Sequence, residues 1–95
     1  MLFVITAFDR PGALELRMQV RSAHLDYLES QSRRIKVGGP LLNDQEQPVG
    51  SLLIIEAEDR KAAEAFADGD PYRRQGVFER VEIRTWRAAL GAWAS

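Results

Sequence analysis

The chain contains no cysteine and only one histidine among its 95 residues. The lack of cysteine excludes disulfide frameworks and thiolate metal centres. One histidine leaves too few of the ligands that zinc prefers, so we expect no metal site and no cofactor. The sequence also has neither the GxSxG motif of serine hydrolases nor a glycine-rich phosphate loop. A histidine with a carboxylate partner is therefore the chemistry left to consider.

The chain also lacks an excess of charges of one sign. The 13 basic and 14 acidic residues give a formal net charge of -1, which argues against nucleic acid as the main partner. Hydrophobic residues make up 45% of the chain, as is typical of a folded protein, and we expect a single domain over residues 1–95. The apolar start, residues 1–8, has no basic leader and is too short to span a membrane. We therefore expect a strand there, no membrane partner and a cytoplasmic protein.

Hydrophobic patterning predicts a β-α-β-β-α-β order. The predicted strands cover residues 2–8, 35–37, 50–57 and 77–86, and the predicted helices cover residues 13–34 and 58–68. This order is typical of the α+β, ferredoxin-like fold, in which two helices cover one face of a four-stranded antiparallel sheet. The other face is then bare. Because the first strand is apolar throughout, we expect a homodimer through this open sheet face.

The first predicted helix has two possible buried faces. One is the stripe formed by Leu14, Met18, Arg21, Leu25 and Leu28, and the other is formed by Leu16, Val20, Ala23 and Tyr27. In the first alternative Arg21 lies in the middle of the buried stripe, and Arg17 and His24 lie at one edge of it. A guanidinium among apolar residues favours a carboxylate partner, from the protein or from a ligand. We therefore expect an anion against Arg21.

Two residues in the last third have a structural and a functional interpretation. Asp70, in DGDPY after the second predicted helix, is the candidate partner of His24. An Asp before Pro is also a common turn initiator or helix cap, and from the residues alone this is the commoner role. Trp93, in the small apolar tail, is predicted to be a packing anchor, which is the commoner role, and not a platform for a ligand.

The segments MLFVITAFDRPGALELR, VRSAHLDYL, VGGPL and AEAFADGDPYRRQGVFERVEIRTW resemble the YciI-like family (YCII-related domain). The motifs R-x-A-H-L and D-P-Y-x-x-x-G-V-F are the most specific, although Ser22 stands where a proline is usual. The resemblance implies a ferredoxin-like domain that dimerises by sheet packing into a dimeric α/β barrel, as in muconolactone isomerase and chloromuconolactone dehalogenase. It also implies an active site that pairs His24 with Asp70.

Together these observations predict a small enzyme that acts on a small anionic carbonyl or lactone compound by proton transfer, as an isomerase, dehalogenase or lyase does. The candidate site consists of catalytic His24 and Asp70 and substrate-binding Arg21, Arg17, Tyr72, Gly39 and Pro40. Tyr72 and the predicted Gly39-Pro40 turn are expected at the entrance. The alternative is a non-catalytic binding or dimeric assembly module in which the His–Asp pair is structural.

Overall fold

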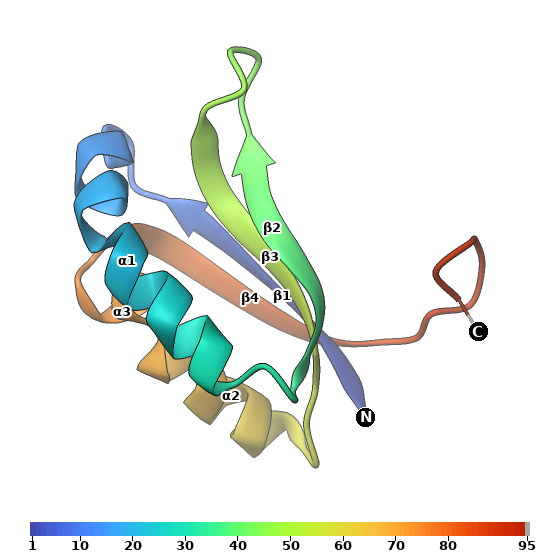
Figure 1. Cartoon of the computed structure of the whole chain (residues 1–95). Helices are drawn as coiled ribbons and strands as arrows, with labels where there is room; N and C mark the ends of the chain where they lie inside the picture. The colour runs from blue at the N-terminus through green and yellow to red at the C-terminus, as the bar shows by residue number, and fades with distance from the viewer. Residues whose placement is uncertain (95) are drawn as a thin grey trace.

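The computed structural model describes residues 1–94, which form a four-stranded antiparallel sheet with helices on one face (Figure 1). The elements are β1 (Leu2–Asp9), α1 (Leu14–Ser30), β2 (Ile35–Leu42), β3 (Pro48–Glu56), α2 (Arg60–Gly69), α3 (Pro71–Arg74) and β4 (Phe78–Trp86). The strand order is β2-β3-β1-β4. This is the predicted α+β, ferredoxin-like fold. That residues 1–95 form a single domain stays a prediction.

The β2 strand is longer than predicted and includes the GGP segment. Gly39 and Pro40 pair with Leu52 and Ser51 of β3, so the turn predicted there is wrong. The strand tolerates Pro40 because β2 lies at the edge of the sheet, where a missing N–H removes no ladder bond on the outer side. A Cβ at position 38 would meet the end of the Leu53 side chain, so a larger residue than Gly38 would require Leu53 to move.

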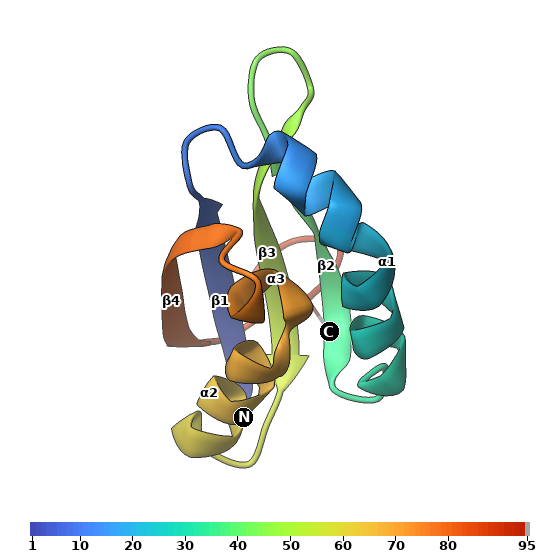
Figure 2. The ribbon, with the colours of Figure 1, turned by 90° about the vertical axis from the view of Figure 1, so that its left-hand side faces the viewer.

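The core lies between the sheet and the helices, all of which stand on one side of the strands (Figure 2). Along β1 the side chains alternate, with Phe3, Ile5 and Ala7 buried toward the helices. Phe3 and Ile5 share one hydrophobic cluster with Phe66 of α2. The residues between them in β1 are half-buried on the outer face, so this strand is less uniformly covered than its apolar sequence suggests. Within residues 1–94, no helix has the length and apolar character required to cross a membrane.

Two capping aspartates fix the starts of α2 and α3. Asp59 accepts a hydrogen bond from the Ala62 amide and starts α2. Asp70 ends α2 and caps α3, with Pro71 in the first turn of α3. The caps fix where Asp70 points, because its side chain must stay near the first amides of α3.

Candidate functional site

The buried face of α1 is polar at its centre. Arg17 and His24 are the buried residues of this helix, at 4% and 7% exposure. By contrast, Met18 and Leu25 are 54% and 43% exposed, and Arg21 is exposed. The prediction of a buried stripe through Arg21 is therefore wrong. Within residues 1–94, Arg21 forms no ion pair with a carboxylate. Arg17 and His24 are able to be buried because the sheet and the cap of α3 supply polar partners for them.

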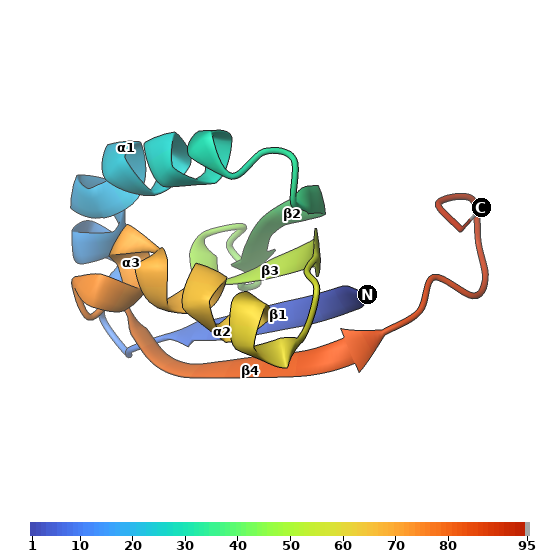
Figure 3. The ribbon, with the colours of Figure 1, turned by 90° about the horizontal axis from the view of Figure 1, so that it is seen from below.

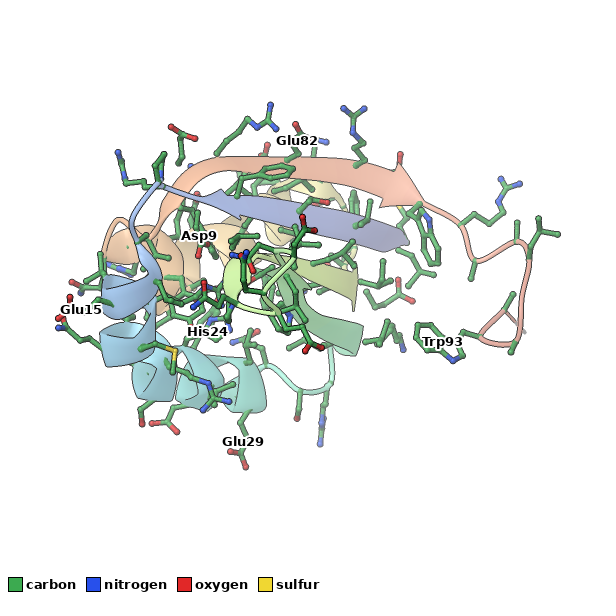
Figure 4. All side chains as sticks on the ribbon, turned by 90° about the horizontal axis from the view of Figure 1, so that it is seen from above. Asp9, Glu15, His24, Glu29, Glu82 and Trp93 are labelled. Atoms are coloured by element: carbon green, nitrogen blue, oxygen red, sulfur yellow. The ribbon has the colours of Figure 1, made fainter. Side chains whose placement is uncertain are left out.

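The alternative face of α1 describes its packing better. Leu16 and Val20 pack against the cluster around Tyr72, and Tyr27 packs against the cluster of Phe66. Ala23 is exposed. Figure 4 shows His24 pointing into the layer between α1 and the sheet, whereas other labelled side chains of the helix point outward.

His24 and Asp70 form a buried hydrogen-bonded pair. The His24 Nδ1 and Asp70 Oδ1 atoms are 2.7 Å apart, and the two side chains are 9% and 6% exposed. The same Oδ1 accepts the Tyr72 amide at 2.9 Å, so Asp70 is both a helix cap and the partner of His24. A carboxylate only accepts hydrogen bonds, so Nδ1 must carry the proton. In a neutral ring, Nε2 then holds the free lone pair.

The Nε2 atom of His24 reaches the surface. It makes no hydrogen bond within residues 1–94, and every fully buried side-chain nitrogen or oxygen of those residues has a partner. Nε2 is therefore not fully buried. On the Asp70 side, a cavity of about 10 Å³ lies between the sheet and the helices, lined by Ser51 and otherwise mostly by apolar residues. This is room for about one water molecule.

Arg17 forms the second half of the polar cluster. Its Nε donates to Asp9 at 2.8 Å, and its Nη2 donates to the Gly50 carbonyl and to Ser51 Oγ, both at 2.7 Å. The Asp9 side chain is only 5% exposed. Arg17 is thus largely committed to the protein. Asp9 and Ser51 were not anticipated from the sequence.

Tyr72 joins the two halves. Its ring stacks on the His24 imidazole with centroids 3.8 Å apart and planes 13° apart, and the Arg17 guanidinium carbon lies 4.5 Å from its centroid. Tyr72 is 1% exposed, so it belongs to the buried wall of the site and not to an entrance. Burial raises the pKa of the Tyr72 hydroxyl, although Arg17 and Arg21 oppose this effect. The hydroxyl therefore stays a proton donor at neutral pH.

The remaining candidates lie around this cluster. Pro40 is the β2 partner of Ser51, which places it beside the Arg17 network, whereas Gly39 is paired with Leu52. Arg21 is exposed but near enough to favour ionisation of Tyr72. Within residues 1–94, no three His, Cys, Asp or Glu side chains gather closely enough to share a metal ion.

The two tyrosines of the chain provide a test of this burial. Burial is the main cause that raises the pKa of both Tyr27 and Tyr72 above the ordinary 10.0. Because the folded values exceed the unfolded ones, this contribution to stability is full below the unfolded pKa and is lost as pH rises through the folded pKa. We expect ultraviolet titration of the folded protein to show both tyrosines ionising above pH 10. Ionisation of either tyrosine at or below its ordinary pKa in the folded state would contradict this.

Comparisons with known proteins place this chain in a family. Residues 1–87 match the YCII-related domain. The chain is 39% identical to protein YciI of Escherichia coli, over 92% of this chain and 97% of that one. The structure of the 5-chloro-2-hydroxyhydroquinone dehydrochlorinase TftG from Burkholderia phenoliruptrix, in complex with 2,5-dihydroxybenzoquinone, is similar with a TM-score of 0.87 and 38% identity. The match covers 94% of this chain and 96% of the TftG chain.

A more distant structure shares the fold alone. An antibiotic biosynthesis monooxygenase is 16% identical, with a TM-score of 0.54, over 95% of this chain and all of that one. The family match, by contrast, covers nearly the whole of the described chain, and the identity to YciI extends over most of both proteins. The chain therefore belongs to the YCII-related domain family.

Proposed function

We propose that the protein is a small enzyme that uses the His24–Asp70 pair for general acid–base chemistry on a small anionic carbonyl or hydroxylated compound. The observation that carries this proposal is the geometry of the pair. Asp70 holds Nδ1, and Nε2 reaches the surface without a protein partner. A histidine oriented in this way takes up a proton at Nε2, while the carboxylate stabilises the imidazolium that forms.

The surrounding side chains suit an anionic substrate. Arg21 is exposed near Tyr72, and the Arg17 guanidinium lies against the Tyr72 ring. The neutral Tyr72 hydroxyl is able to donate a hydrogen bond to an oxygen of the substrate. The proposed roles are proton transfer for His24, orientation for Asp70, and attraction of the anion for Arg21 and Arg17.

The similarity to TftG favours elimination as the reaction. TftG is a dehydrochlorinase, and its structure holds 2,5-dihydroxybenzoquinone. Loss of HCl from a chlorinated hydroquinone gives a quinone without an external oxidant, because chloride leaves with the bonding electron pair. The ring carbon that loses chloride must gain a hydrogen. His24 Nε2 would therefore accept a proton from a ring hydroxyl and return it to that carbon, while a second hydroxyl proton is released to water as chloride leaves. Lactone isomerisation requires the same single proton shuttle.

A second candidate function is a binding or assembly module in which His24 and Asp70 form a structural lock. The burial of the pair favours it, because both side chains are at least nine-tenths buried and the adjoining cavity holds about one water molecule. Catalysis then requires the substrate to meet His24 from the Nε2 side. The two candidates differ in whether the protein turns a ligand over.

An assay of the wild-type protein separates these candidates. We expect chloride release from 5-chloro-2-hydroxyhydroquinone and calorimetric binding of 2,5-dihydroxybenzoquinone. Binding of the quinone without turnover of any chlorinated hydroquinone or lactone would favour the binding module. If neither compound binds, the hydroxylated-ring substrate class is wrong for this chain.

We also propose a homodimer through the open sheet face. Val4 and Leu52 lie half-buried in the middle of this face, on the two central strands, beside Ile54, which is already buried in the single chain. On the outer face of β4 they are flanked by Arg80, Glu82 and Arg84, which alternate in charge. A two-fold axis brings the same patch of both copies together, and alternating charges are then able to pair with one another.

A further inference from the structure

The last residues of the chain form an apolar tail. Residues 88–95 lie beyond the family match, and residues 88–94, AALGAWA, contain no charged or polar side chain. Leu90 is 92% exposed and Trp93 is 86% exposed, more than any other large hydrophobic residue of the described chain. Tails that remain in solvent are typically rich in charge and poor in aromatic residues. This tail has the composition of a segment that packs against protein.

The tail cannot pack on its own domain in the conformation observed. Figures 1 and 3 show that it leaves the end of β4 and runs away from the body of the molecule. In Figure 2, where the helices face the viewer, the tail passes behind the sheet. The tail thus lies on the side of the open sheet face, opposite the helices. Trp93 is at the far end of the molecule in Figure 4, away from the His24 site.

We infer that the tail, residues 88–94, packs against a second copy of this chain, with Leu90 and Trp93 as its anchors. This inference rests on the proposed dimer. A copy seated on the open sheet face would occupy the side of the sheet on which the tail lies. Trp86, 44% exposed and paired with Leu2, continues the apolar outer face to the point where the tail begins. By symmetry each copy would hold the tail of the other.

The test compares dimer affinity in wild type, in a chain ending after Arg87, and in a Leu90→Ala, Trp93→Ala variant. Burial of a large apolar side chain contributes strongly to association, and the dimer contains each anchor twice. We therefore expect both changes to weaken the dimer by about 100-fold or more in sedimentation equilibrium. Met18→Ala is the matched control, because Met18 is an exposed apolar residue on the helical side. It should leave the affinity unchanged.

Fluorescence identifies what the tail contacts. The chain has two tryptophans, so Trp86→Phe leaves Trp93 as the sole reporter. We expect its emission to shift to the blue as protein concentration rises through the dimerisation range. A blue shift independent of concentration would mean that the tail folds on its own sheet, and emission typical of solvent at all concentrations would mean that it stays free. Either result overturns the inference.

The possible outcomes also distinguish a failure of the tail inference from a failure of the proposed dimer. If wild type is a dimer and the chain ending after Arg87 dimerises equally well, the tail inference is wrong and the sheet dimer stands. If wild type remains a monomer over a wide concentration range in light scattering, both are wrong. The His24 proposal is independent of either result, because the tail lies away from that site.

Discussion

Arg17→Met is expected to lower the free energy of unfolding by about 3–5 kcal/mol, because it leaves a buried carboxylate without its counter-ion. The Asp9 side chain is only 5% exposed, and Arg17 is its ion-pair partner at 2.8 Å. The Gly50 carbonyl and Ser51 hydroxyl lose a donor at the same time. For a chain of this size, Tm should fall by more than about 12 °C. Thermal and urea unfolding measure both quantities.

Arg21→Met is the matched control for this prediction. Arg21 lies one helical turn away on the same helix but is exposed, and its replacement should change stability by less than about 0.5 kcal/mol. In an Asp9→Asn, Arg17→Met double variant, removal of the stranded charge should recover part of the loss, which a double-mutant cycle would show. Equal effects of the two arginine substitutions would contradict the buried pair.

Asp70→Asn is expected to reduce kcat by about 100-fold or more while changing Tm little, if the His24–Asp70 pair acts in catalysis. Asparagine keeps an oxygen that is able to accept the Tyr72 amide, so the cap survives. It removes the charge that stabilises the protonated imidazole. His24→Asn should reduce turnover at least as strongly. The measurement is chloride release with the hydroxylated aromatic substrate.

The control for Asp70→Asn is Asp59→Asn, which makes the same chemical change at the cap of α2. Asp59 is exposed, and this substitution should alter neither turnover nor Tm. The opposite pattern at Asp70, with a large fall in Tm and unchanged turnover, would favour the structural lock. That pattern would leave the binding or assembly module as the better account.

The sequence alone was sufficient for the fold and for the two residues of the pair. The order of elements follows from hydrophobic patterning, and the resemblance to the YciI-like family named His24 and Asp70. The hydrogen-bond partners of Arg17 could not be predicted from the sequence, because they depend on the register between strands. Ser51 lies opposite Ala7, two residues before Asp9 on the same face of β1. No local pattern in the chain indicates that these distant residues share one guanidinium.

The errors have physical causes as well. Residue spacing showed which residues of α1 share one side of the helix, but it did not show which side faces the sheet. The buried side is the one that carries Arg17 and His24, which find polar partners there, and not the side with Arg21 and the neighbouring leucines. The GGP segment has the composition of a turn, but an edge strand tolerates it. Trp93 was predicted to be a packing anchor. It is 86% exposed, so its packing partner is not found within the described part of the chain, residues 1–94.

The most direct test of the central claim is the nitrogen NMR spectrum of His24, the only histidine in the chain. Asp70 accepts a hydrogen bond from Nδ1, so the neutral ring should carry its proton on Nδ1 and leave Nε2 unprotonated. Addition of 2,5-dihydroxybenzoquinone should then move the Nε2 resonance most, because Nε2 is the atom that meets the ligand. A neutral ring protonated at Nε2, or an Nε2 resonance that saturating ligand leaves unchanged, would contradict the proposed proton transfer at this atom.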